Sequence, residues 1–250
     1  MRNVGASLTN SRQPCHANSR APDDAPRPIR SFESSCYGAV ARLQEIRKLS
    51  IAAYLRQVAR DMENTSSWPS MERVEGAITG ITKALAANKP LLVCGNGGSA
   101  SDAMHISGEL VGRFLKERRA LNCVCLSSNP AIMTAWSNDY SYDTLFSRQV
   151  EAYGAPGGVV LGLSTSGNSM NVVKAFEAGR AKQMTTVGLT GEGGGKMAAV
   201  ADILIDVPSK STPVIQQIHI CLYHYICAEI ENRITASQND KRSEKVSTVR

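Results

Sequence analysis

Five short apolar runs that alternate with segments of helical spacing constrain the fold of this 250-residue chain more than any other feature. Each run is five or six residues long, which is an ordinary length for a buried strand. Strands separated by helices predict a parallel sheet with helices on both of its faces. We therefore expect strands at 90–94, 121–126, 158–163, 185–189 and 203–207.

Apolar residues spaced three and four apart predict the helices around these strands. Two of these helices, 36–63 and 71–87, precede the first strand, and one at 212–234, apolar nearly all round, follows the last. The remaining helices are expected between the strands, at 99–114, 130–136, 142–153, 170–182 and 195–200. These elements predict an α/β fold in a single domain, 36–235, with N-terminal helices, a five-stranded parallel sheet and a long C-terminal helix.

The two ends of the chain differ from this middle part. Residues 1–35 are rich in Arg, Ser and Pro and have no periodicity, so they predict a disordered extension, and the polar residues 236–250 predict a flexible tail. Each end carries +2 of the formal net charge of +6. Charge on polar tails is typical of solvation rather than of a phosphate-backbone footprint, so we expect no nucleic-acid partner.

Two further features indicate the compartment. No apolar run approaches the roughly 20 residues that a membrane span needs, so we expect no membrane association. Seven cysteines occur without a C-x-x-C pair, which favours buried free thiols in a reducing cytoplasm over a disulfide framework or a metal site.

Two turns that follow strands carry groups suited to an anion. The first strand leads into Gly95–Ser99 and the third into Ser164–Ser169, and a helix follows each turn. Backbone N–H groups and hydroxyls at a helix N-terminus favour an anion, although a capped helix with a glycine turn explains either segment alone. Two such turns in one α/β unit favour a phosphate on a small molecule. Neither the nucleoside-triphosphate loop nor the dinucleotide glycine pattern occurs.

The few histidines outside the N-terminal end suggest a second kind of site. His105 and Glu109 share one face of a helix, and Gln216, His219 and His224 lie on the last helix. A His, Glu, Gln, His set could bind a divalent metal such as zinc, but ordinary packed polar pairs are an equally simple reading. Gln216 and His224 are separated by about 12 Å of helical rise. Gln216 and His224 can therefore bind one metal only if the metal lies between them, if the helix is deformed, or if different chains contribute the ligands.

Together these segments resemble the sugar isomerase (SIS) fold family and, within it, the bacterial phosphoheptose isomerases. The resemblance covers roughly residues 36–234. It rests on 95–110 (GNGGSASDAMHISGEL), 137–152 (SNDYSYDTLFSRQVEA), 163–169 (LSTSGNS), 189–197 (LTGEGGGKM) and 211–224 (STPVIQQIHICLYH). It departs from the family at Gln217, where a Glu is common, and in the long N-terminal extension.

The resemblance implies a cytoplasmic homotetramer with active sites shared between subunits and one Zn²⁺ per subunit. The implied reaction interconverts sedoheptulose 7-phosphate and D-glycero-D-manno-heptose 7-phosphate through an enediolate. It would be the first step of ADP- or GDP-activated heptose biosynthesis, for example toward lipopolysaccharide.

The resemblance also implies residue roles. Glu109 and His224 match the acid–base pair of the family, and the metal ligands would be His105, Glu109, Gln216 and His224. The substrate-binding residues would be Asn96, Gly97, Gly98, Glu109, Asn138, Asp139, Ser164, Thr165, Ser166, Ser169 and Gln216.

Two alternatives stay open. Non-catalytic SIS modules that associate with replication initiators are similar over the same stretch, but they lack the glutamate and the final histidine that stand here as Glu109 and His224. Other SIS sugar-phosphate isomerases usually carry different loops and no matching His, Glu, Gln, His set.

Overall fold

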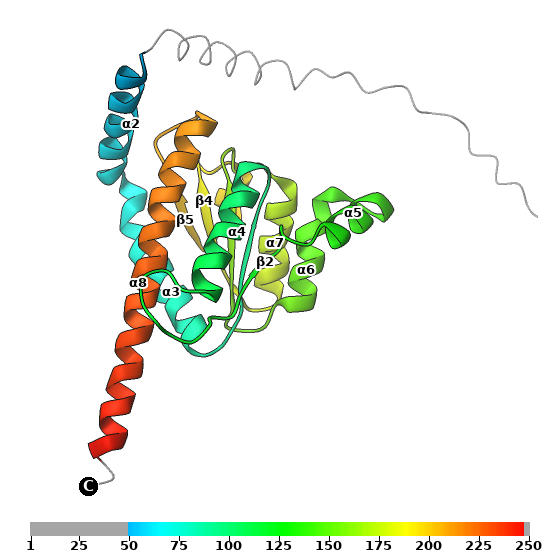
Figure 1. Cartoon of the computed structure of the whole chain (residues 1–250). Coiled ribbons are helices and arrows are strands. Elements are labelled where there is room, and N and C mark those ends of the chain that lie inside the picture. Colours follow the sequence, from blue (N-terminus) through cyan, green and yellow to red (C-terminus); the bar gives the residue numbers. More distant parts are fainter. Residues whose placement is uncertain (1–49, 248–250) are drawn as a thin grey trace, which may run out of the picture. The chain divides into compact units, whose positions relative to one another are not determined.

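The computed structural model describes residues 50–247 (Figure 1), and its sheet confirms the predicted five parallel strands. The strands lie in the order β2-β1-β3-β4-β5, so β1 is flanked by β2 and β3. In this order a ligand site is expected at the carboxyl ends of β1 and β3, because the chain leaves these two adjacent strands in opposite directions along the sheet. The strands are β1 (Leu91–Gly95), β2 (Cys123–Cys125), β3 (Val159–Ser164), β4 (Thr185–Thr190) and β5 (Ile203–Asp206).

Helices cover both faces of this sheet. The core of one face packs against α3 (Val74–Ala86), α4 (Gly98–Val111) and α8 (Thr212–Ser247). The core of the other face packs against α5 (Pro130–Asp139), α6 (Leu145–Tyr153) and α7 (Met170–Ala181). The first described helix, α2 (Ile51–Ser66), contacts α8.

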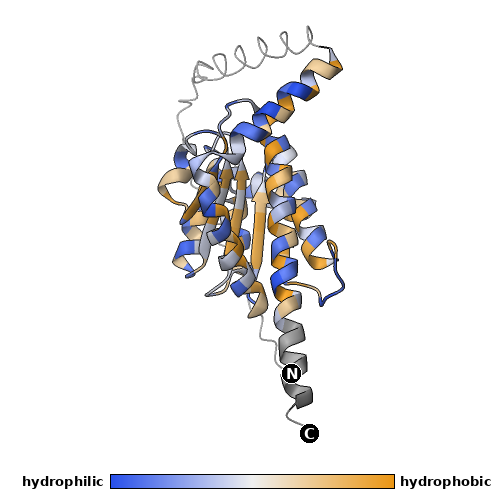
Figure 2. Cartoon of the chain, turned by 90° about the vertical axis from the view of Figure 1, so that its left-hand side faces the viewer, coloured by the Kyte–Doolittle hydropathy of each residue, from blue (hydrophilic) through white to orange (hydrophobic). Residues whose placement is uncertain are grey.

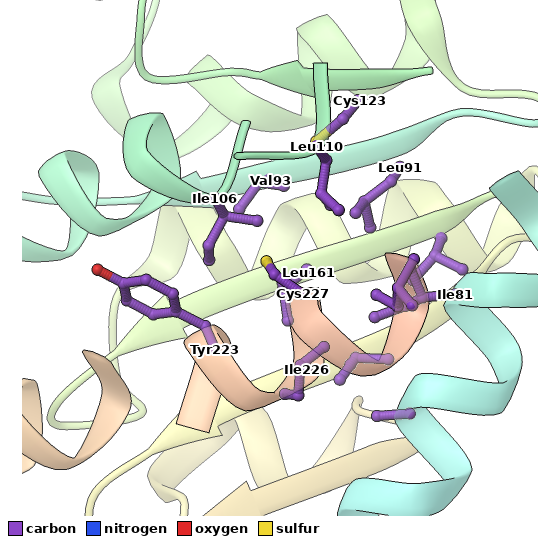
Figure 3. Packing of buried hydrophobic residues seen from close by; sticks show 14 of the residues in the cluster. Ile81, Leu91, Val93, Ile106, Leu110, Cys123, Leu161, Tyr223, Ile226 and Cys227 are labelled. Carbon is purple, nitrogen blue, oxygen red and sulfur yellow. The ribbon is translucent and has the colours of Figure 1, made fainter. Parts of the chain in front are cut away.

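Alternate residues of each strand supply the two cores. Leu91 and Val93 of β1 point into the core shared with α4 and α8, whereas Leu92 and Cys94 point into the opposite core. Figure 3 shows the first core, in which Ile106 of α4 and Tyr223 of α8 pack near Val93. The strands are hydrophobic along most of their length because both faces are covered, whereas the helices also carry polar residues (Figure 2).

Several helix boundaries differ from the predicted ones for local reasons. A 3-10 turn, η1 (Pro69–Arg73), precedes α3, because Pro69 has no N–H to donate and suits a helix start. Further 3-10 turns replace the α-helix at η2 (Tyr142–Thr144) and η3 (Gly195–Ala199). α2 begins at Ile51, with the Ser50 hydroxyl accepting from the N–H of Ala53 at 3.2 Å. Residues 36–49 of the predicted first helix lie outside the described part.

The C-terminal helix is longer than predicted. α8 continues to Ser247, past the expected end at 234 and through most of the segment predicted to be a flexible tail. No Gly or Pro occurs between 234 and 247, so the sequence holds none of the usual stop signals, and Lys, Arg, Glu and Gln there favour a helix. The predicted extension 1–35 lies outside the described residues. Within them, no helix is both long and apolar enough for a membrane span.

Candidate active site

A cavity of about 250 Å³ lies at the carboxyl ends of β1 and β3, where the strand order predicts a ligand site. Both predicted anion turns line it, together with the first turns of α8. The lining residues are Asn96, Gly97, Gly98, Ser99, Leu163, Ser164, Thr165, Ser166, Ser169, Thr212 and Gln216. The structure therefore brings together most of the residues that the sequence predicts to contact substrate, and it adds Ser99, Leu163 and Thr212.

Two glycines shape the first turn. Gly97 has a φ of +56°, a backbone conformation that other residues rarely adopt, and it precedes the first residue of α4. A side chain at Gly98 would collide with the amide of Gln216. The glycines thus allow α4 and α8 to approach closely at the cavity.

Three helix N-termini meet at this cavity. α4 begins at Gly98, Ser169 is the N-cap of α7, and α8 begins at Thr212. The hydroxyls of Ser164 and Ser169 lie 2.9 Å apart, so both can turn toward one ligand. The lining residues carry no charged side chain within the described part of the chain. An anion here would be bound by N–H groups, hydroxyls and helix dipoles.

Asn96 is held by two residues that the sequence analysis did not identify. Its side-chain amide and that of Asn171 bond reciprocally at 2.9 Å, and the Tyr142 hydroxyl donates to its oxygen at 2.7 Å. Asn171 is buried on α7. The available signal in the sequence was an Asn near the start of the predicted helix that follows the Ser164–Ser169 turn. Once such an amide is buried, it needs polar partners.

A second cluster lies farther along the same two helices. His105 and Glu109 of α4 and His224 of α8 place one ligand atom each within 4.8 Å of one another. His105 Nε2 lies 3.0 Å from Glu109 Oε1, and the rings of His105 and His224 meet edge to face at 5.0 Å. Two imidazoles and one carboxylate match the donor set of catalytic zinc, which binds such ligands at about 2.0–2.2 Å. By donor type and mutual proximity, these three residues fit a zinc ion.

The surroundings of this cluster also suit a metal ligand. The Tyr223 hydroxyl bonds the other ring nitrogen of His105 at 2.8 Å, which fixes the ring, as is usual for a ligating histidine. Burial is the main reason that the pKa values of Tyr223 and nearby Asp102 are both raised. The ring of Phe114 stacks on His224, with 5.7 Å between ring centroids.

Three of the predicted site residues lie outside a group in which the resemblance places them. Gln216 faces the cavity, two helical turns before His224, and so stands apart from the other three predicted ligands. Asn138 and Asp139 bond to each other at 2.8 Å on the exposed end of α5, outside the cavity lining. The rigid rise of α8 keeps Gln216 and His224 apart, as their spacing in the sequence indicates.

His219 belongs to neither group. Its ring is fully buried, Nε2 lies 3.2 Å from the carbonyl oxygen of Thr190, and Nδ1 has no partner. Burial lowers the pKa of His219 to about 4. It is a structural histidine that remains neutral.

Comparisons with known proteins agree with this architecture. The family model of the SIS domain matches residues 53–191. A phosphoheptose isomerase of Rhodospirillum rubrum is 53% identical over 154 residues, which cover 62% of this chain and 82% of that protein. Solved phosphoheptose isomerases from Neisseria gonorrhoeae (37% identical, covering 76% of this chain and 99% of that one) and Francisella tularensis (30%, 73% and 96%) both give a TM-score of 0.68. The chain therefore belongs to the SIS domain family.

Proposed function

We propose that this protein is an isomerase that interconverts sedoheptulose 7-phosphate and D-glycero-D-manno-heptose 7-phosphate. The observation that carries the proposal is the cluster of His105, Glu109 and His224 on the two helices, α4 and α8, whose first turns line the anion-binding cavity. A carboxylate and an imidazole are the groups that an aldose–ketose isomerisation needs, and here they lie on the same two helices as a phosphate-type cavity. A pure binding module needs only the cavity.

In the proposed mechanism Glu109 and His224 each move one proton out and back. Glu109 removes a proton from C1 of the open-chain ketose, and the released electron pair forms the C1–C2 double bond as the carbonyl pair moves onto O2. His224 donates a proton to O2. Glu109 then returns its proton to C2, and His224 recovers a proton from O1 as the aldehyde forms. The phosphate stays bound throughout by Ser164, Thr165, Ser166 and Ser169.

We propose Zn²⁺ as the metal of the His105, Glu109 and His224 cluster. When bound, zinc supplies a Lewis acid for the negative charge that develops on the sugar oxygens. Within a single chain Gln216 lines the cavity, so its primary proposed role is substrate binding. Its proposed role as a fourth ligand depends on how subunits assemble.

We further propose a homotetramer in which neighbouring subunits complete each site. Ile51 and Leu55 on α2 are 72% and 59% exposed, and Tyr225 on α8 is 57% exposed, which supports a covered face in an assembly. Asn138 and Asp139 lie outside their own subunit's cavity and would contact substrate from this arrangement. Buried, unpaired Cys94, Cys123 and Cys227 support a reducing cytoplasm.

The direct test is to incubate the purified protein with sedoheptulose 7-phosphate and Zn²⁺ and to follow the aldose anomeric signals by NMR. We expect these signals to grow to an equilibrium value. Absence of turnover by a folded, zinc-supplied protein contradicts the proposal.

Substitutions then test the acid–base roles. Glu109→Gln and His224→Gln should each lower kcat by about 10²–10⁴-fold, with a smaller change in KM. Glu177→Gln, an exposed carboxylate on α7, is the matched control and should retain wild-type rates. Zinc content is measured for each variant, because Glu109→Gln with zinc retained and activity lost separates the base from a ligand. Full activity in either variant would exclude this mechanism.

A further inference from the structure

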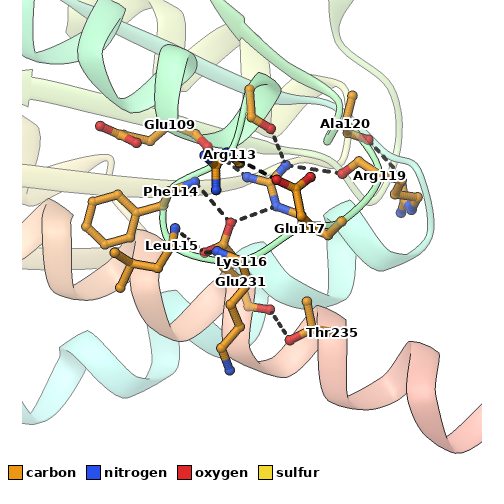
Figure 4. A network of polar contacts seen from close by, with 12 residues as sticks. Glu109, Arg113, Phe114, Leu115, Lys116, Glu117, Arg119, Ala120, Glu231 and Thr235 are labelled. Carbon is orange, nitrogen blue, oxygen red and sulfur yellow. Dashed lines mark hydrogen bonds and ion pairs between the residues drawn. The ribbon is translucent and has the colours of Figure 1, made fainter.

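Away from the cavity, a buried ion pair organises Gly112–Arg119, the larger part of the connection between α4 and β2, which we call the 112–119 loop (Figure 4). The carboxylate of Glu231, on α8, accepts the backbone N–H groups of Phe114, Leu115 and Lys116 at 3.0, 2.6 and 2.7 Å. The side chains of Glu231 and Arg118 are 1% and 0% exposed, and Arg118 Nε lies 3.2 Å from Glu231 Oε1. This contact is an ion pair without hydrogen-bond alignment.

Glu231 is held in its charged form by these neighbours. Burial alone would raise the pKa of Glu231, but the three N–H donors and Arg118 together hold it below its usual value. Removing either partner of such a pair leaves an uncompensated charge in the interior. The loop therefore depends on both residues for its conformation.

The same network reaches two residues of the proposed active site. The Arg118 guanidinium donates to the carbonyl oxygen of Glu109 at 2.7 Å and to that of Gly112 at 2.8 Å, so it holds the last turn of α4. Phe114, whose N–H bonds Glu231, stacks its ring on His224 with an angle of 23° between the planes. Glu231 also follows His224 by two turns on nearly the same face of α8.

We infer that Glu231 and Arg118 are positioning residues for the His105, Glu109 and His224 cluster, acting through the stacked ring of Phe114 and the backbone of Glu109. Neither residue touches the cavity that would bind the sugar phosphate. Their effect therefore falls on metal binding and on the proton-transfer step rather than on phosphate binding. This inference rests on the proposed function for its kinetic consequence and on the proposed zinc site for its effect on metal binding, whereas its effect on the His224 ring needs neither.

The test compares three variants with the wild type. Glu231→Gln keeps the shape, removes the charge and turns an NH₂ group toward backbone donors. Phe114→Leu removes the stacked ring and leaves the ion pair intact, so it tests the contact through which Glu231 would act even if Glu231→Gln does not fold. Glu229→Gln is the matched control, because this carboxylate lies on the same helix and its polar partners among residues 50–247 are Arg233 and Asn232.

The first readout is the histidine ring spectrum of metal-free, ¹³C-histidine-labelled protein, with the His224 signals assigned from His224→Gln. We expect these signals to move in Glu231→Gln, because the phenyl ring of Phe114 shifts relative to His224, and in Phe114→Leu, because that ring and its ring current are absent. They should stay unchanged in Glu229→Gln. The second readout is zinc affinity by chelator competition, which should fall by about 10–100-fold in the first two variants.

Kinetics supplies the third readout. With sedoheptulose 7-phosphate, kcat should fall by about 10–100-fold in Glu231→Gln and Phe114→Leu, while KM changes by less than about threefold. Wild-type His224 signals and wild-type zinc affinity in both folded variants would overturn the inference. If the wild type itself does not turn over this substrate, the proposed function fails, and the spectral and zinc readouts still decide the positioning roles.

Discussion

The buried His219 should make the folded protein lose stability in mild acid, and the size of this loss follows from its surroundings. The ring is fully buried, and within the described part of the chain its Nδ1 and the nearby Thr190 hydroxyl have no partners and no acidic side chain bonds it. Burial lowers the pKa of His219 from 6.5 to about 4 in the folded state. Between these values only the unfolded chain binds the proton, so stability falls as the pH falls.

Linkage sets the magnitude. Where the unfolded state is protonated and the folded state is not, the free energy of unfolding changes by about 1.4 kcal/mol per pH unit. Integrated from pH 7.5 down to pH 5 with these two pKa values, the loss is about 2 kcal/mol per subunit. The contribution is fully present above pH 6.5 and declines until the pH reaches the folded pKa.

The assay is urea unfolding at pH 7.5, 6.5, 6.0, 5.5 and 5.0, at one fixed protein concentration because assembly couples to stability. The perturbation is His219→Gln, whose amide nitrogen can replace the ring nitrogen that faces Thr190 and which does not titrate. Carboxylates titrate alike in both proteins, so the difference between the two curves isolates His219. We expect the wild type to lose about 2 kcal/mol more than the variant between pH 7.5 and pH 5. Parallel curves for the two proteins would refute the reasoning.

Three further outcomes test other parts of the molecule. Ser164→Ala combined with Ser169→Ala should raise KM by about tenfold or more with little change in kcat, because the phosphate is bound alike in the ground and transition states. Steady-state kinetics measures both constants, and an unchanged KM would contradict the assignment of this turn to the phosphate. Prolonged chelation should abolish turnover and added Zn²⁺ should restore it, whereas activity that survives with no metal left, by elemental analysis, argues against a catalytic metal. Ile51→Asp with Leu55→Asp should shift the sedimentation mass from four subunits to fewer, since these exposed apolar side chains lie on the proposed contact face. A wild-type protein that already sediments as a monomer would exclude the tetramer.

The sequence alone located the strands and the two anion turns. Short apolar runs such as 158–163, bounded by turn residues, are typical of strands in a covered sheet, and a parallel sheet places every strand-to-helix turn at one edge. The pairing of His105 with Glu109 was equally readable, because residues four apart on a helix are neighbours. The spacing of Gln216 and His224 likewise corresponds to about 12 Å of rise along α8, since helical rise does not depend on tertiary packing.

Tertiary structure decided which distant segments meet. The strand order puts β1 beside β3, and only this pairing joins the turns at Gly97 and Ser166 in one cavity. The packing of α8 against α4 selects His224 to face His105, and it seats Glu231 under the 112–119 loop. The α8 contacts link residues more than a hundred positions apart, and no local pattern encodes them, because a buried charge or ring takes its partners from whichever surface the packed helices bring to it.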